Sequence, residues 1–77
     1  MINNLNTEQE LYSIISGTVK EILVKKGDVV KEGQPLLILE AMKMRNRIPA
    51  EYDGKVKKIN IKPDQKIPKN YLMIEFE

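Results

Sequence analysis

Apolar residues along the chain come in short runs, and a turn signal follows each run within a few residues. No stretch keeps a 3.6-residue apolar period over three turns, so the pattern predicts an all-β domain with little helix. Strands are expected over residues 11–15, 18–24, 29–30, 36–40, 45–50, 55–61 and 71–76. Turns are expected at Gly27-Asp28, Glu32-Gly33, Asp53-Gly54 and Pro63-Asp64.

The chain contains two copies of one unit. Shifting the sequence by 37 residues places residues 17–40 on residues 54–77 without a gap, and six of the 24 aligned positions are identical. The identical pairs are Gly17/Gly54, Val19/Val56, Lys20/Lys57, Ile22/Ile59, Lys25/Lys62 and Glu40/Glu77. Each copy is too small to complete a core alone, so the repeat predicts a domain with pseudo-twofold symmetry. Two small antiparallel sheets, closed on each other as a flattened barrel, would let the two copies complete one shared core.

The repeat also predicts which side chains point inward. Ile38 aligns with the charged Glu75, so these two residues belong to the outer face and their strand neighbours belong to the core. The expected core is Val19, Ile22, Val24, Val30, Leu37, Leu39, Val56, Ile59, Ile61, Ile67, Ile74 and Phe76. Residues 1–10 have little to bury and are expected to form a flexible leader, with the folded domain over residues 11–77.

Composition excludes several classes of protein. The 77 residues suffice for one domain, and they include no Cys and no His. This removes disulfide frameworks, zinc fingers and Ser/His or Cys nucleophiles, so neither a catalytic residue nor a metal site is expected. The longest apolar run, residues 36–39, is far shorter than the ~20 residues of a membrane span, and no signal-peptide pattern is present. A cytoplasmic, non-enzymatic protein without membrane insertion is expected.

The net charge of +2 is unevenly distributed. Residues 41–69 contain nine Lys or Arg and three acidic residues. A small basic β-barrel that binds single-stranded nucleic acid would need exposed aromatic residues on which bases stack. The four aromatic residues are scattered, at Tyr12, Tyr52, Tyr71 and Phe76. We therefore interpret the lysines as solvated outward positions on strands and keep nucleic-acid binding as a remote alternative.

The thirteen residues between the two copies begin with Ala41-Met42-Lys43-Met44. If the strands before and after are antiparallel neighbours, Met42 and Lys43 form a tight hairpin turn, on the pseudo-twofold axis and at one end of the molecule. Neither residue is a usual turn former. The residues alone leave two interpretations open. In the first, Lys43 is a functional group at a protruding tip. In the second, the two Met side chains pack over the barrel end, and Lys43 is an ordinary surface lysine.

The segment Glu40-Ala41-Met42-Lys43-Met44 resembles the attachment motif of the biotinyl domain family, which includes biotin carboxyl carrier proteins and carrier domains of biotin-dependent carboxylases. The similarity covers about residues 11–77. Further matching segments are Lys26-Gly27-Asp28, Gly33-Gln34-Pro35, Asn46-x-Ile48-x-Ala50 and Asp53-Gly54. Related lipoyl domains typically have Asp-Lys-Ala where this chain has Met-Lys-Met, so biotin is favoured. The resemblance implies a flattened β-barrel, or barrel-sandwich hybrid, of two four-stranded antiparallel sheets.

The resemblance also implies a function. Biotin would be attached covalently to Lys43 within the hairpin 41–45, with Met42 and Met44 as flanking recognition residues and with Ala41 and Glu40 completing the motif. The chain would be the non-catalytic biotin carboxyl carrier of a biotin-dependent carboxylase or decarboxylase, for example an acyl-CoA carboxylase. Its swinging arm would move carboxyl groups between biotin carboxylase and carboxyltransferase sites. Biotin protein ligase, biotin carboxylase and carboxyltransferase are the implied partners, and a lipoyl carrier is the alternative.

Two features depart from the family pattern. Arg45 stands where the family usually has an acidic or amide residue. In the second copy, Asp64 and Asn70 replace Gly27 and Gly33 of the first. Asp and Asn tolerate the left-handed backbone conformation best among residues with a side chain, so we expect both turns to be retained.

Overall fold

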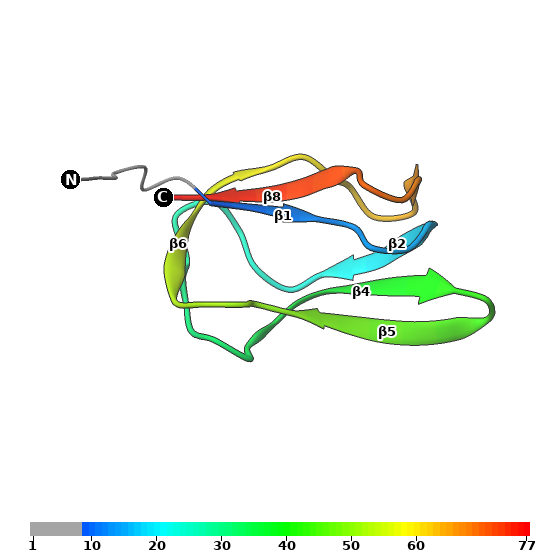
Figure 1. The fold of residues 1–77 in the computed structure, drawn as a ribbon, viewed down its shortest axis with the longest axis horizontal. Coiled ribbons are helices and arrows are strands. Elements are labelled where there is room, and N and C mark those ends of the chain that lie inside the picture. Colours follow the sequence, from blue (N-terminus) through cyan, green and yellow to red (C-terminus); the bar gives the residue numbers. More distant parts are fainter. Residues whose placement is uncertain (1–8) are drawn as a thin grey trace.

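A computed structural model describes residues 9–77, which form eight strands in two four-stranded sheets (Figure 1). The strands are β1 (Gln9–Tyr12), β2 (Gly17–Ile22), β3 (Val29–Val30), β4 (Pro35–Ala41), β5 (Met44–Pro49), β6 (Gly54–Ile59), β7 (Lys66–Ile67) and β8 (Leu72–Phe76). One sheet has the order β1-β8-β6-β3 and the other β5-β4-β2-β7, and all neighbours are antiparallel. The predicted all-β fold of two four-stranded sheets is confirmed. The sheets pack as a flattened sandwich and are not closed into one continuous barrel.

The pseudo-twofold symmetry extends beyond the two sequence copies. Exchanging β2, β3 and β4 with β6, β7 and β8, and β5 with β1, converts the order of one sheet into that of the other. Backbone hydrogen bonds follow the same rule: Gly27 N–H donates to Val56 O at 2.8 Å, and Asp64 N–H donates to Val19 O at 2.6 Å. Strand β1 therefore pairs with β8 of the second copy in the same way as β5 pairs with β4 of the first copy.

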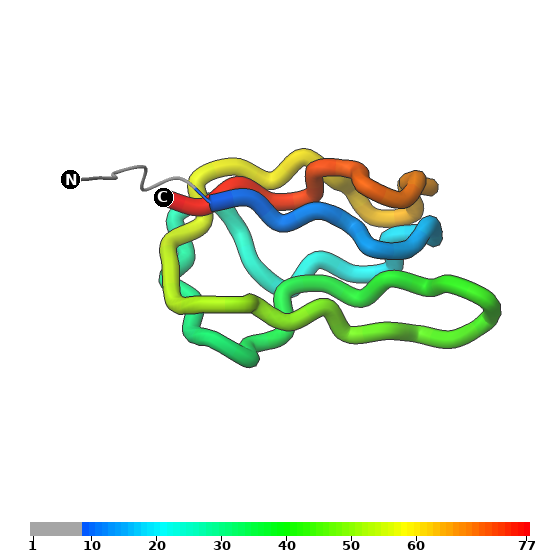
Figure 2. Tube along the Cα trace, viewed as in Figure 1, coloured from blue at the N-terminus to red at the C-terminus, as the bar shows by residue number. Residues whose placement is uncertain are grey.

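This symmetry corrects the expected position of the Met42-Lys43 turn. A feature on the twofold axis must coincide with its own equivalent, yet the equivalent of the β4–β5 turn falls between the C-terminus and β1. Figures 1 and 2 show this turn at one end of the molecule and the C-terminus, with the start of β1, at the opposite end. The turn is at a molecular end, as predicted, but it does not lie on the axis.

The core lies between the sheets. It comprises Leu11, Val19, Val24, Val30, Leu36, Leu37, Leu39, Ala50, Val56, Ile61, Ile67, Met73, Ile74 and Phe76. Of the predicted core residues, Ile22 and Ile59 are partly buried against this cluster and the others are buried. Leu36 and Met73 were not expected because strict alternation would turn them outward. Each is skipped in the pairing of its strand with the edge strand, and such a β-bulge lets two successive side chains face inward.

Several strand boundaries differ from the expected ones. Strand β1 begins at Gln9 and ends at Tyr12, so Gln9 and Glu10 of the predicted leader lie in a sheet. Ile14 and Ile15, predicted as strand, form the β1–β2 loop because the buried Ser13 hydroxyl donates to the Ile15 carbonyl and closes a local turn. Residues 1–8 of the predicted leader lie outside the described residues. Strand β7 was not predicted, although the repeat aligns it with β3.

The two substituted glycine turns keep their backbone conformation. Gly27 and Gly33 have φ angles of 92° and 87°, and the equivalent Asp64 and Asn70 have 68° and 70°. The expectation that Asp and Asn preserve these left-handed turns is confirmed. Both copies can therefore have the same fold although the second copy lacks the glycines.

This conformation makes Asn70 sensitive to substitution. Asn70→Ala is expected to lower the free energy of unfolding by about 1 kcal/mol, because a left-handed conformation is unfavourable for an ordinary L-residue by roughly that amount. Asn70→Gly is expected to stay within about 0.5 kcal/mol of the parent, since Gly adopts this conformation readily. Thermal unfolding followed by circular dichroism measures both variants. Equal destabilisation by Ala and Gly would contradict this explanation.

Candidate attachment site

Strands β4 and β5 form a hairpin whose turn consists of Met42 and Lys43 alone, since Ala41 pairs with Met44. The φ angles of Met42 and Lys43 are 53° and 65°. Positive φ at both central positions is typical of a type I′ turn, whose twist matches that of the flanking strands. The predicted tight turn is confirmed. Two residues without a preference for this conformation are held in it by the β4–β5 pairing, and such strain is common at functional sites.

The side chains of the turn project into solvent. Met42 is 94% exposed and Met44 is 66% exposed, and Lys43 is also exposed. Neither Met can therefore cap the core, so the interpretation that they pack over the barrel end is wrong. Most of each Met side chain is therefore accessible to another molecule.

The base of the hairpin is packed closely against β2. An added Cβ at Gly17 would lie 2.5 Å from the Glu40 carbonyl oxygen and 3.3 Å from the Ala41 Cβ. Small residues at 17 and 41 thus allow the two strands to approach, which positions the hairpin. The sequence analysis did not assign this role to Gly17, although its identity with Gly54 in the repeat was a signal.

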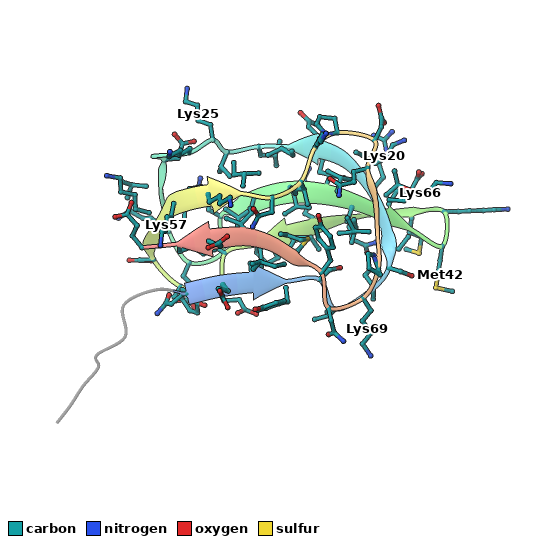
Figure 3. All side chains as sticks on the ribbon, turned by 90° about the horizontal axis from the view of Figure 1, so that it is seen from above. Lys20, Lys25, Met42, Lys57, Lys66 and Lys69 are labelled. Carbon is teal, nitrogen blue, oxygen red and sulfur yellow. The ribbon has the colours of Figure 1, made fainter. Side chains whose placement is uncertain are left out.

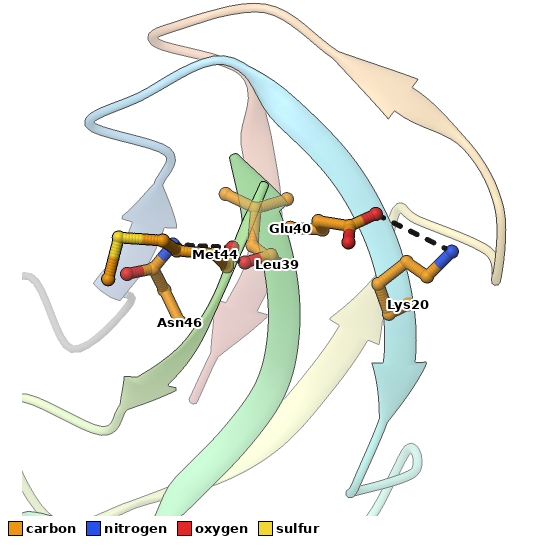
Figure 4. A network of polar contacts seen from close by, with 5 residues as sticks. All are labelled: Lys20, Leu39, Glu40, Met44 and Asn46. Carbon is orange, nitrogen blue, oxygen red and sulfur yellow. Dashed lines mark hydrogen bonds and ion pairs between the residues drawn. The ribbon is translucent and has the colours of Figure 1, made fainter. Parts of the chain in front are cut away.

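Polar contacts add to this support. Glu40 Oε1 lies 3.7 Å from Lys20 Nζ, and both side chains are about one-third exposed, so this ion pair stabilises the fold only weakly (Figure 4). Asn46 Nδ2 donates to the carbonyl oxygens of Leu39 and Met44, each at 3.3 Å (Figure 4). Asn46 therefore braces both strands of the hairpin next to the turn. It entered the sequence analysis only as part of the family resemblance.

A shallow groove of about 400 Å³ opens beside the hairpin. It is lined by Ile14, Ile15, Ser16, Ala41, Met42, Met44, Asn46 and Lys69. The sequence analysis missed this groove because Ile14 and Ile15 were assigned to a strand. Figure 3 shows Met42 and Lys69 at the same end of the molecule, together with Lys20 and Lys66. At the end of the molecule that presents Lys43, apolar side chains thus line most of the groove and lysines lie around it.

Residues 9–77 contain no group of three or more His, Cys, Asp or Glu residues that could hold a metal ion. In the same part of the chain, no helix has the length and apolar character needed to cross a membrane. Lys43 is exposed and lies at the tip of the two-stranded β4–β5 hairpin. In this position the amine of Lys43 is accessible to other proteins.

Residues 10–76 match the family model described as "Biotin-requiring enzyme". The chain belongs to the biotinyl/lipoyl attachment domain family. Carrier domains of this family are non-catalytic parts of larger enzymes, and this chain is a non-catalytic domain of the same family.

The sequence relatives include an acetyltransferase component, a carboxylase chain and a biotin carboxyl carrier protein. The chain is 48% identical over 64 residues to the dihydrolipoyllysine-residue acetyltransferase component of the pyruvate dehydrogenase complex of Mycoplasma capricolum, covering 83% of this chain and 15% of that protein. It is 39% identical over 72 residues to the mitochondrial propionyl-CoA carboxylase alpha chain of Sus scrofa, covering 94% and 10%. The biotin carboxyl carrier protein of Streptococcus mutans is 49% identical over 51 residues, covering 66% and 39%. The chain thus spans between a tenth and about two-fifths of these relatives.

Solved structures agree with the fold. A single-chain, multi-domain long-chain acyl-CoA carboxylase superposes with a TM-score of 0.87 at 25% identity, over 99% of this chain and 8% of that one. The lipoyl domain of the 2-oxoglutarate dehydrogenase complex from Azotobacter vinelandii superposes with a TM-score of 0.76 at 22% identity, over 88% and 94%. The second match concerns the fold alone.

Proposed function

We propose that this domain is a biotin carboxyl carrier in which Lys43 is covalently biotinylated. The observation that supports this most directly is the exposed Met42-Lys43-Met44 tip of the β4–β5 hairpin, with Met42 94% exposed. A reactive group on this tip is accessible from several directions while its base stays fixed. The domain would move carboxyl groups between the biotin carboxylase and carboxyltransferase sites of a biotin-dependent carboxylase by swinging this arm.

The residues present fit an amide-linked group. Lys43 Nζ would attack an activated biotinyl carbonyl within the ligase, after losing a proton there, and a C–N bond would form as the activating group leaves. The positive charge of Lys43 disappears in the amide. When bound, biotin supplies the ureido ring that accepts and releases the carboxyl group. The β-sandwich presents and tethers the group, and tethering raises its effective concentration at each partner site.

A lipoyl carrier is the second candidate, and the 48% identity to the acetyltransferase component favours it. The Met residues on both sides of Lys43 favour biotin. Intact mass after expression with a biotin ligase or a lipoyl ligase separates the two. Biotin adds about 226 Da and lipoyl about 188 Da, from the formulae of the cofactors. An addition of about 188 Da with lipoyl ligase, and none with biotin ligase, would overturn the proposal.

Met42 is expected to be a recognition residue for the ligase. Met42→Ala should leave the free energy of unfolding within about 0.5 kcal/mol, since the side chain is almost fully exposed. The rate of biotinylation at limiting ligase should fall roughly tenfold, which corresponds to about 1.4 kcal/mol of lost contact in the complex. Val29→Ala is the matched control, because Val29 is 73% exposed on β3 and outside the hairpin. Equal rates for the two variants would contradict a recognition role.

The remaining partners are also part of the proposal. Affinity capture with the biotinylated domain should recover biotin carboxylase and carboxyltransferase subunits, and the Lys43→Ala variant should recover less of both. The predicted cytoplasmic location is tested by cell fractionation with avidin detection.

A further inference from the structure

The groove beside the hairpin breaks the symmetry of the fold. Its residues Ile14 and Ile15 lie in the β1–β2 loop and are 77% and 36% exposed. The repeat aligns Ile14 with Glu51 and Ile15 with Tyr52, in the equivalent loop before β6. The fold itself therefore does not require an exposed Ile at position 14, because a charged residue occupies the equivalent position. The apolar pair is found at the end of the molecule that presents Lys43.

The β1–β2 loop is fixed before any ligand arrives. Ser13 is 2% exposed, and its hydroxyl donates to the Ile15 carbonyl. Its backbone N–H donates to Tyr71 O at 2.9 Å, and its carbonyl accepts from Asn70 N–H at 2.6 Å. These bonds hold the loop against the turn after β7. The groove is thus preformed, which reduces the entropy lost when a group binds in it.

We propose that this groove is a resting site for the biotinyl group on Lys43. The proposal depends on the proposed function and adds a binding site for the group on the carrier itself. The groove begins at Met42 and Met44, the two neighbours of the attachment residue, so a group on the Lys43 arm meets it first. Its volume of about 400 Å³ lies in the range of small-molecule sites, which are mostly apolar with a few orienting polar groups.

The lining matches the chemistry of biotin. The Ile and Met side chains suit the thioether ring and the aliphatic tail, and Met adapts its shape to such a group. The ureido ring has two N–H donors and one carbonyl acceptor. Asn46 directs its amide nitrogen at the carbonyls of Leu39 and Met44, which leaves its side-chain oxygen to accept from a ureido N–H. The Lys69 ammonium can donate to the ureido carbonyl.

Tethering decides whether such a shallow site is occupied. A short flexible tether gives an effective concentration in the millimolar range. A site with an intrinsic Kd of about 1 mM for the head group would then be filled in about half of the molecules. Binding of this strength would keep the head group near the carrier and still release it to a partner enzyme that binds it more tightly.

The test compares amide chemical shifts of the unmodified and biotinylated domain, after intact mass has established the modification. We expect shift changes at Ile14, Ile15, Ser16 and Lys69 in addition to those at the turn. Ile14→Glu, which introduces the residue of the equivalent loop, should reduce the changes at Ser16 and Lys69 at least fivefold. Val29→Glu, at an exposed site on β3, is the matched control and should leave them unchanged.

Three outcomes would overturn the proposal. Biotinylated protein with shift changes confined to Met42, Lys43 and Met44 would exclude the resting site and leave the carrier function standing. If Ile14→Glu slowed the ligase and the modified domain showed no changes in the groove, the groove would serve a partner protein. Absence of the added 226 Da, expected for biotin from its formula, would remove the carrier function and the resting site together.

Discussion

Lys43→Ala is expected to abolish covalent biotinylation completely while the fold remains intact. The amine of Lys43 is the nucleophile of the proposed attachment, and alanine has none. The substitution should not disturb the turn, because Lys43 is exposed and its φ of 65° is equally unfavourable for Lys and Ala. Intact mass after co-expression with biotin ligase should show no addition. The midpoint of thermal unfolding should change by less than about 3 °C.

Lys66→Ala is the matched control for this experiment. Lys66 is an exposed lysine on β7, at the same end of the molecule as the hairpin (Figure 3). Its removal should leave the added mass of about 226 Da, known from the formula of biotin, in place. Modification that persists in Lys43→Ala, or that disappears in Lys66→Ala, would show that another lysine is the attachment residue.

The sequence predicted two antiparallel sheets with pseudo-twofold symmetry because the repeat constrains the fold strongly. Once residues 17–40 are aligned with residues 54–77, each copy limits the possible structures of the other. The left-handed turns at Asp64 and Asn70 could be predicted because glycines occupy the equivalent positions in the first copy. The hairpin turn could also be predicted, because it is the segment that the repeat leaves between two strands.

Other features could not be predicted because they depend on local contacts that the apolar pattern does not encode. The β-bulges at Leu36 and Met73 break the period of two, so alternation alone assigns these residues to the wrong face. Ile14 and Ile15 have strong strand propensity, but the Ser13 hydroxyl bond turns them into a loop. The groove lies in this loop and was missed with it.

The two ends of the molecule differ in what they present. The C-terminus and the start of β1 lie at one end of the molecule, and the β4–β5 turn lies at the other (Figure 1). In the proposed carrier, a connection to a larger enzyme at the first end would leave the turn accessible. The pseudo-twofold symmetry builds the shared core, and the proposed sites lie where the two halves differ. The Met42-Lys43 turn and the Ile14-Ile15 loop are two such places.

Gly17 and Gly54 are identical residues with different surroundings, and they give a strong test of the packing at the base of the hairpin. Gly17→Ala would place its Cβ 2.5 Å from the Glu40 carbonyl oxygen, so β4 must move away from β2. We expect a loss of about 2 kcal/mol in the free energy of unfolding, typical of overpacking in a close-packed site. For a domain of this size, the midpoint of thermal unfolding should fall by roughly 10 °C.

Gly54→Ala is the equivalent substitution in the second copy and should have the opposite sign. The atoms nearest to its added Cβ lie 3.8–3.9 Å away, which is ordinary van der Waals contact. Neither glycine has a positive φ, so alanine is compatible with both backbones. Gly54→Ala should therefore stabilise the domain by up to about 1 kcal/mol, because it restricts the unfolded chain. Equal destabilisation of the two variants would contradict the close packing of β2 against Glu40 and Ala41 at the base of the β4–β5 hairpin.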